Sequence, residues 1–112
     1  MSVGRAGEEL AAAYLVCQGY KICERNLFFR TGEIDILAEK GGCLVIVEVK
    51  TVSGKDFGPA KGYVNQRKQE KLKHLSGYLI QKFPNKRIRI DVIGVDLSTD
   101  KPVFEHIENA VF

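Results

Sequence analysis

Hydrophobic and polar positions alternate most regularly between residues 33 and 50, where two runs rich in Val and Ile flank Gly41 and Gly42. Two glycines between such runs are a strong signal for a β-hairpin with a tight turn. We therefore expect two antiparallel strands joined at these glycines. The facing pairs would be Lys40 with Cys43, Leu37 with Ile46, Asp35 with Glu48, and Glu33 with Lys50.

Because side chains alternate between the two faces of a strand, the predicted hairpin has two unlike faces. One face is wholly apolar and carries Ile34, Ile36, Ala38, Val45, Val47 and Val49. The other face is apolar near the turn and charged at its far end. Its residues are Leu37, Leu44 and Ile46, followed by Glu33, Asp35, Glu48 and Lys50.

The pairing of Asp35 with Glu48 is unfavourable by itself. Their Cβ atoms would lie about 5 Å apart, and at an effective dielectric near 20 two such charges repel by roughly 3 kcal/mol. Protonation of one carboxyl group removes the repulsion, and so does a divalent cation such as Mg2+, which prefers oxygen ligands. Lys50 would lie about 7 Å further along the same face, where its charge can hold a water or an anion beside the metal.

The rest of the chain predicts two helices and three further strands. We expect helices over residues 2–18 and 60–82, strands over 20–29, 86–96 and 103–108, and a loop over 51–59 that leaves the charged end of the hairpin. Gly19 would cap the first helix at its C-terminal end. For the lone His106 in the last strand, a structural or surface role is favoured. The fold is thus of the α/β class, with the order helix, three strands, helix, strand, short edge strand.

Each predicted helix carries one charged residue with two interpretations. Glu8 borders the apolar stripe of the first helix, so it is either an acid favoured by the dipole of the first turn or a carboxylate that reaches inward. Lys68 lies in an otherwise apolar column of the second helix. It either lays its stem along the core and extends its ammonium group to solvent, or it directs that charge at Asp35 and Glu48.

Length and composition favour one globular domain over residues 1–112. Hydrophobic residues make up 45% of the 112, which is enough for a core and argues against disorder. The sequence has no apolar stretch of the length that spans a bilayer and none that resembles a signal peptide. The three cysteines show no Cys-x-x-Cys spacing, so we expect reduced, mostly buried thiols in a cytoplasmic protein.

The charge is unevenly distributed, although the net charge is only +3. Between Lys61 and Arg89 nine Lys or Arg side chains accompany a single acid, Glu70, so the remainder of the chain is acidic. One basic and one acidic region suit a polyanionic ligand together with a metal site. A solvated helix face rich in lysine is the alternative interpretation of the basic segment.

Several stretches resemble the YraN-like family of small bacterial proteins, within the PD-(D/E)xK nuclease superfamily and near its archaeal Holliday junction resolvases. The resemblance covers nearly the whole chain. It implies a restriction-endonuclease-like three-layer core of order αβββαβ(β), with a mixed sheet flanked by helices. The matching stretches are Gly7-Glu8-x-x-Ala11-x-x-Tyr14-Leu15, Gly19-Tyr20, Arg25-Asn26, Gly32-Glu33-Ile34-Asp35, Val47-Glu48-Val49-Lys50, Phe57-Gly58 and Lys68.

The resemblance also implies roles for individual residues. Asp35 and Glu48 would be metal ligands, the carbonyl of Val49 would complete the metal shell, and Lys50 would position the attacking water. Glu8 matches the helix glutamate of the family motif, which makes it a further candidate ligand, and Lys68 matches the lysine of the second helix. This chain departs from the family pattern in having Val52 where an arginine is frequent, and Ile34 where the superfamily motif has proline.

The resulting hypothesis is an endonuclease that depends on Mg2+ or Mn2+. Basic side chains, for which Lys61, Arg67, Lys68 and Lys71 are the candidates, would bind the nucleic-acid backbone by charge. We expect selectivity for structure, with branched DNA favoured, and symmetric cutting of a junction would require a homodimer. The alternatives are a nucleic-acid-binding module that keeps the nuclease frame without catalysis, and a structural adaptor in which Glu33 pairs with Lys50 and Asp35 with an arginine.

Overall fold

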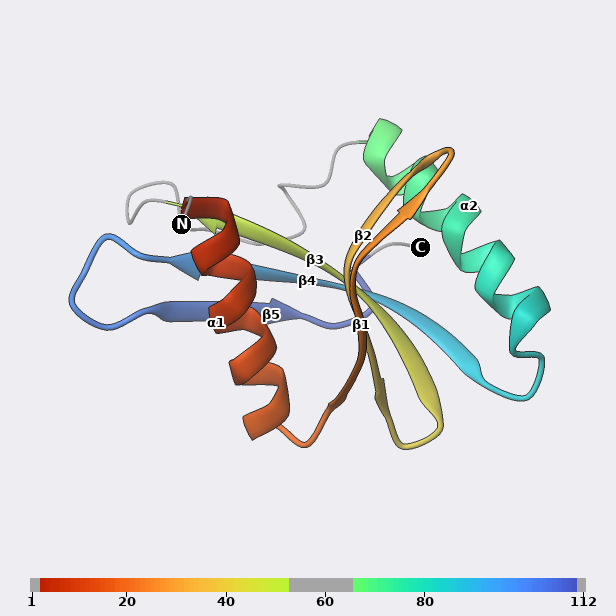
Figure 1. The fold of residues 1–112 in the computed structure, drawn as a ribbon, viewed down its shortest axis with the longest axis horizontal. Coiled ribbons are helices and arrows are strands. Elements are labelled where there is room, and N and C mark those ends of the chain that lie inside the picture. The colour runs from red at the N-terminus through yellow and green to blue at the C-terminus, as the bar shows by residue number, and fades with distance from the viewer. Residues whose placement is uncertain (1–2, 53–65, 111–112) are drawn as a thin grey trace.

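The computed structural model describes residues 3–52 and 66–110, which form two helices and five strands (Figure 1). The predicted order of elements is confirmed. The elements are α1 (Val3–Cys17), β1 (Lys21–Phe29), β2 (Gly32–Lys40), β3 (Cys43–Val52), α2 (Gln66–Lys82), β4 (Arg87–Asp96) and β5 (Val103–Ile107). The third strand runs on through Thr51 and Val52, where we expected a loop. The rest of that loop and the first six residues of the expected second helix, Lys61 among them, lie outside the described residues.

The five strands form one mixed sheet in the order β1-β2-β3-β4-β5. Neighbouring strands are antiparallel except β3 and β4, which are parallel and are joined through α2. Parallel neighbours need such a crossover, because the chain must return to the starting edge before the second strand begins. As expected, the short last strand β5 lies at an edge of the sheet.

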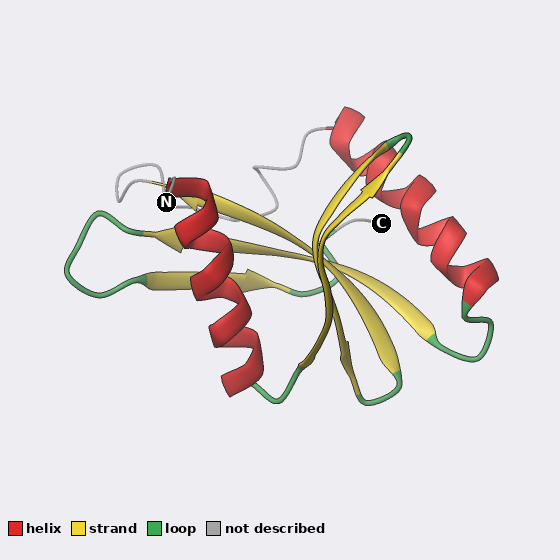
Figure 2. Ribbon diagram, viewed as in Figure 1, coloured by secondary structure: helices red, strands yellow, loops and turns green. Residues whose placement is uncertain are grey.

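Each face of the sheet packs against one helix, which gives the expected three layers (Figure 2). Ala11, Ala12 and Leu15 of α1 share a core with residues of β2, β3 and β4 on one face. On the other face, Leu72, Leu75 and Leu79 of α2 form a second core. The helical spacing of these leucines predicted that buried stripe correctly.

The glycine turn and the first pairs of the hairpin are as predicted. Gly41 and Gly42 have φ angles of 58° and 75°, a left-handed conformation that favours glycine and suits a two-residue hairpin turn. Lys40 pairs with Cys43 and Leu37 with Ile46. Gly19 ends α1, with a φ of 91° and with the amide of Tyr20 bonded to the carbonyl of Leu15 at 2.9 Å.

Beyond Ile36 and Val47, the last pair of the ladder, β2 and β3 separate. From that point β2 stays paired with β1 as far as Gly32, whereas β3 stays paired with β4 as far as Val52. Figure 1 shows the two pairs of strands running in different directions beyond this fork. The predicted ladder pairs Asp35–Glu48 and Glu33–Lys50 are therefore wrong, because these residues lie past the last pair.

The expected apolar face is also wrong at one position, because Ile34 packs in the α2 core while Ile36 packs in the α1 core. In a regular strand, two residues that are two positions apart lie on the same face. The cause lies next to Asp35: Asn26 of β1 has a φ of 52°, and the pairing of β1 with β2 skips its position. The irregularity interrupts the alternation of faces at the start of the fork.

The cysteines differ in burial. Cys43 is buried in β3, Cys23 is half-buried, and Cys17 is exposed at the end of α1, so the expectation of mostly buried thiols is wrong for Cys17. The last turn of α1 directs this side chain to solvent. Among the described residues, neither helix has both the length and the apolar character that crossing a membrane requires.

Candidate functional site

The fork between β2 and β3 brings Asp35 and Glu48 together, although they are not partners in the ladder. Because the ladder has ended, the amide of Val49 is free to donate to a side chain, and it bonds Oδ2 of Asp35 at 2.9 Å. Glu48, at 7% exposure, is buried beside Asp35, and the two carboxyl groups are in hydrogen-bond contact. A carboxyl–carboxyl hydrogen bond requires a proton on one of the two groups.

The surroundings of Asp35 and Glu48 disfavour the ionised form of both carboxyl groups. Burial first, and then the neighbouring charge of Asp35, raise the pKa of Glu48 to about 7, against the opposing effect of Lys68. Burial also raises the pKa of Asp35, although the Val49 amide and Lys68 oppose this. A buried and a half-buried carboxyl group side by side, both with raised pKa values, form a pair that a bound cation would stabilise in its ionised form.

Lys68 of α2 forms an ion pair with Oε1 of Glu48. Of the two interpretations open to the sequence, the structure therefore places its charge on the carboxylates. The side chain of Lys68 is 45% exposed, whereas that of Glu48 is 9% exposed, so the cation reaches in from solvent to a buried partner. Because the ammonium group of Lys68 is already close to solvent, separating it from Glu48 requires no desolvation of the lysine.

A cavity of about 480 Å3 lies between the fork and α2. One wall is acidic and the other, formed by α2, is basic. The charged residues that line it are Glu33, Asp35, Glu48, Arg67, Lys68 and Lys71. The structure thus brings three of the four basic candidates to the carboxylate pair, and the fourth, Lys61, lies outside the described residues.

Glu8 of α1 approaches the same carboxylates from the other helix. Burial first, and then Asp35 and Glu33, raise its pKa. With the amide of Asn26 oriented so that its nitrogen faces these acceptors, it donates to Oε1 of Glu8 at 2.9 Å and to Oε1 of Glu33 at 3.1 Å. Sequence reasoning assigned no role to Asn26, although an asparagine within a strand-like run is a signal for a left-handed residue.

Lys50 is one of three described site candidates, with Glu8 and Val49, that do not line the cavity. It follows Glu48 by two positions on β3 and is exposed, but it is not among the described residues that line the cavity. Glu33, its expected partner, instead pairs across the ladder with Phe28 and accepts from Asn26.

A second polar cluster, which the sequence analysis did not predict, lies on the α1 face of the sheet. Asp91, His106 and Glu108 each offer a ligand atom, and these atoms lie within 4.8 Å of one another, so the group could hold a metal. His106 Nε2 is 2.7 Å from Oδ2 of Asp91. Within the described part of the chain, no other group of three such residues has its ligand atoms within 4.8 Å of one another. Glu8 therefore does not form such a group with Asp35 and Glu48.

The carboxylate of Asp91 is, however, already saturated. Arg89 donates to both of its oxygens at 2.8 Å, and the amide of Asn109 donates to Oδ1 at 2.9 Å. Although burial alone would raise the pKa of Asp91, the hydrogen bonds from His106, Arg89 and Asn109 lower it. A guanidinium group stands where a cation would bind, and it also lies 3.6 Å from Oε1 of Glu108.

The two clusters therefore fit a metal unequally. Asp35 and Glu48 offer oxygen atoms, which hard divalent ions prefer. Burial raises both of their pKa values, so the ionised pair lacks the compensating charge that a cation would supply. At Asp91 the compensating charge is already part of the fold. The two groups therefore differ in whether a guanidinium already neutralises the carboxylate that a metal would bind.

Comparison with known proteins gives the chain clear relatives. A sequence model of UPF0102, an uncharacterised protein family, matches residues 7–95. The chain is 44% identical to a UPF0102 protein of Thermodesulfovibrio yellowstonii over all of this chain and 97% of that protein. It is 40% identical to one of Flavobacterium psychrophilum, over 98% and 93% of the two chains. Among solved structures, that of Pyrococcus furiosus SfsA in complex with Ca2+ has a TM-score of 0.35 and 14% identity, over 98% of this chain and 64% of that chain.

Proposed function

We propose that this chain, which belongs to the YraN-like family UPF0102, is a metal-dependent endonuclease that hydrolyses phosphodiester bonds in nucleic acid. The observation that carries the proposal is the pair of carboxyl groups at the fork, which face a basic helix across a cavity. Membership of the PD-(D/E)xK superfamily, which the sequence motif suggests, is part of this proposal.

Asp35 and Glu48 are the proposed ligands, with the carbonyl of Val49 beside them. A strand residue directs its N–H and C=O groups to the same side, so the Val49 carbonyl is directed toward β2 like the amide that bonds Asp35. A bound Mg2+ or Mn2+ supplies Lewis-acid activation of the phosphate and of a water. Glu8, whose pKa Asp35 helps to raise, is proposed to act on that shell through a water.

The cationic residues divide the remaining work. Lys50, on β3 beside Glu48, is proposed to orient the attacking water and to stabilise the negative charge that develops on the phosphate. Lys68 holds Glu48 in the free protein and is proposed to move to a phosphate oxygen when substrate and metal bind. This exchange is open to it because its side chain is half exposed.

The basic wall of the cavity supports the choice of nucleic acid as the substrate. Arg67 and Lys71 are exposed on α2 and line the cavity that contains the carboxylates. Contacts of this kind bind the phosphate backbone and read little sequence. We therefore propose selectivity for structure, with branched DNA as the favoured substrate and a homodimer as the form that cuts a junction symmetrically.

The test is a cleavage panel with labelled junctions, flaps, duplexes and single strands, of DNA and of RNA, in Mg2+ and in Mn2+. The parent protein should cut at least one of these substrates. Asp35→Asn and Glu48→Gln should each reduce the cleavage rate by at least about 100-fold, because each weakens one of the two proposed metal ligands, while binding at low salt persists. Cleavage by both variants at the parent rate would contradict the proposal.

One observation favours a second candidate, a nucleic-acid-binding module without catalysis. Lys50, the expected water-positioning residue, lies outside the lining of the cavity in the described residues. Under this alternative, the panel gives binding that weakens steeply with salt and no cleavage in either metal. Lys50→Ala separates the two, because only an enzyme loses a rate when that side chain is removed.

A further inference from the structure

Asn26 has an unusual backbone for a residue within a strand. Its φ is 52°, whereas antiparallel strands have φ near −140°. The ladder between β1 and β2 pairs Arg25 with Ile36 and Leu27 with Ile34, and it skips the position between them, where Asn26 would face Asp35. Asparagine tolerates the left-handed region better than most residues, and glycine tolerates it best. The backbone requirement alone would thus be met by glycine.

The side chain of Asn26 makes contacts that glycine cannot make. Its amide nitrogen lies 2.9 Å from Oε1 of Glu8 and 3.1 Å from Oε1 of Glu33. A primary amide carries two N–H donors, one for each of these acceptors. The two carboxylates belong to different elements, α1 and β2, so the amide ties the helix to the hairpin at the edge of the candidate site.

Without these donors, nothing in this contact would hold Glu8 toward the site. Glu8, Glu33 and Asp35 carry like charges, and both Asp35 and Glu33 raise the pKa of Glu8, after burial. Like charges at short range favour rotamers that carry Glu8 away to solvent, and a glutamate on a helix has several such rotamers. An amide that donates to two of the three carboxylates opposes that movement.

We propose that Asn26 is a positioning residue of the metal site, which fixes Glu8 and Glu33 beside Asp35 through its side-chain amide. The inference rests on the proposed function, because the site that it serves is the one formed by Asp35 and Glu48. Asn26 contacts no substrate and no metal. It acts through Glu8 and Glu33, as partners that orient ligands do in metal sites generally.

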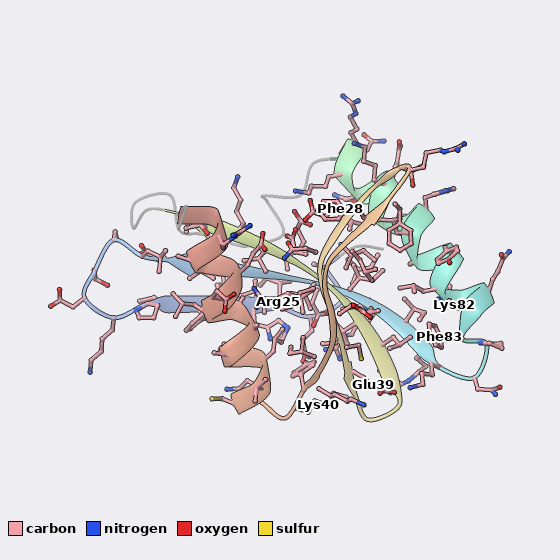
Figure 3. The ribbon with its side chains drawn as sticks, in the orientation of Figure 1. Arg25, Phe28, Glu39, Lys40, Lys82 and Phe83 are labelled. Carbon is pink, nitrogen blue, oxygen red and sulfur yellow. The ribbon has the colours of Figure 1, made fainter. Side chains whose placement is uncertain are left out.

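A neighbouring contact provides a matched control for the docking of the helix. Arg25, the residue before Asn26, forms an ion pair at 2.9 Å with Glu9, the residue after Glu8 (Figure 3 labels Arg25 between α1 and the strands). This pair joins β1 to α1, as the contact of Asn26 with Glu8 does. Its carboxylate is half exposed and does not line the cavity. Glu9→Gln therefore weakens the docking of α1 while keeping Glu8, Glu33 and Asn26 in place, with Arg25 still acting on Glu8.

The experiment measures Mn2+ binding by titration calorimetry and the thermal midpoint of unfolding for the parent, Asn26→Gly and Glu9→Gln. Asn26→Gly should unfold within a few degrees of the parent, because the relief of the left-handed backbone offsets part of the loss of the two amide contacts. Its Mn2+ dissociation constant should rise about 10-fold or more, the usual effect of removing a residue that orients metal ligands. Glu9→Gln should bind Mn2+ like the parent.

A double-mutant comparison shows whether Asn26 acts through Glu8. In a Glu8→Gln background, Asn26→Gly should change the dissociation constant by much less than it does in the parent, since residues in one network are not additive. Equal Mn2+ affinity of the parent and Asn26→Gly would overturn the inference and leave the proposed function standing. If the parent itself binds no Mn2+ in an Asp35-dependent way, both fall together.

Discussion

Glu48 and Asp91 are buried carboxyl groups on adjacent central strands of one sheet, and they face opposite helices. The pKa of Glu48 is raised to about 7, whereas that of Asp91 is lowered. Burial acts in the same direction on both groups. The difference comes from the neighbours: a second acid and an exposed lysine beside Glu48, and an arginine, a histidine and a backbone amide around Asp91.

The two sites also differ in how their cations are held. Arg89 is fixed by two hydrogen bonds to Asp91 and by a third, at 2.7 Å, to the hydroxyl of Tyr20. Lys68 approaches Glu48 from solvent, with nearly half of its side chain exposed. Asp91 is thus held by a guanidinium fixed at three points, whereas the partner of Glu48 is a lysine whose side chain is nearly half exposed; under the proposed function this lysine gives way to a metal. The carboxylate of Asp91 is fully hydrogen-bonded and is part of the structural cluster, whereas the carboxyl group of Glu48 at the candidate site is buried beside a second acid.

The largest expected effect comes from removing the fixed cation. Arg89→Met keeps most of the apolar stem but leaves Asp91 buried without its main partner, so it should lower the free energy of unfolding by about 3 kcal/mol at pH 7.5. Chemical denaturation with urea measures this. As a matched control, Arg25→Met removes an arginine from a more exposed ion pair and should cost less than about 1 kcal/mol. Equal losses in the two variants would remove the distinction between the sites.

The second prediction distinguishes the two clusters as metal sites. Mn2+ at 100 times its dissociation constant should stabilise the parent by about 2.7 kcal/mol, as any ligand of the native state does at that concentration. Asp35→Asn should abolish this gain. Glu108→Gln, which removes a ligand from the other cluster, should leave it unchanged, because Arg89 already occupies that position. Thermal unfolding with and without Mn2+ measures both, and the reverse pattern would assign the metal to Asp91 and His106.

The sequence predicted only part of the two carboxylate sites, because a local pattern predicts contacts between neighbouring segments but not contacts with distant strands. Gly41 and Gly42 set the register near the turn, so the pairs down to Leu37 and Ile46 follow from the local pattern. The same register extended past Ile36 is wrong, because beyond it β2 stays paired with β1 and β3 with β4, and these partners come from elsewhere in the chain. Asp35 and Glu48 still meet because the strands have only begun to separate at that level.

The Asp91 cluster was beyond prediction for a related reason. Its members are brought together by the pairing of β4 with β5, which joins Ile93 to His106, and by the position of Arg89 on the α1 face. Neither the partner of an edge strand nor its register can be inferred from the alternation of one strand. Lys68 was ambiguous because helical spacing places it on the inward face without specifying the strand that this face meets.

The smallest expected effect, and the one that tests the electrostatic contrast most directly, is the dependence of stability on pH. Glu48 has a pKa of about 7 in the folded protein against 4.5 as the reference value, so between these values the folded protein binds more protons than the unfolded chain. Stability must then fall as the pH rises. At about 1.4 kcal/mol for each pH unit that separates the two pKa values, the loss in metal-free protein between pH 5 and pH 8 should be roughly 2 kcal/mol, because part of the change takes place below pH 5.

Asp91 has the opposite sign and acts in another range. Because its pKa is lowered, its contribution is complete above the reference value of 3.8 and is lost only as the pH falls below it. Urea denaturation of metal-free protein at pH 5, 6, 7 and 8 therefore isolates Glu48 from Asp91. Glu48→Gln should flatten the profile, and saturating Mn2+ should reverse its slope, because ionised carboxylates bind the ion better. If the parent profile is as flat as that of Glu48→Gln, folding does not raise the pKa of Glu48. The electrostatic contrast between Glu48 and Asp91, on which the proposed metal site rests, would then be absent.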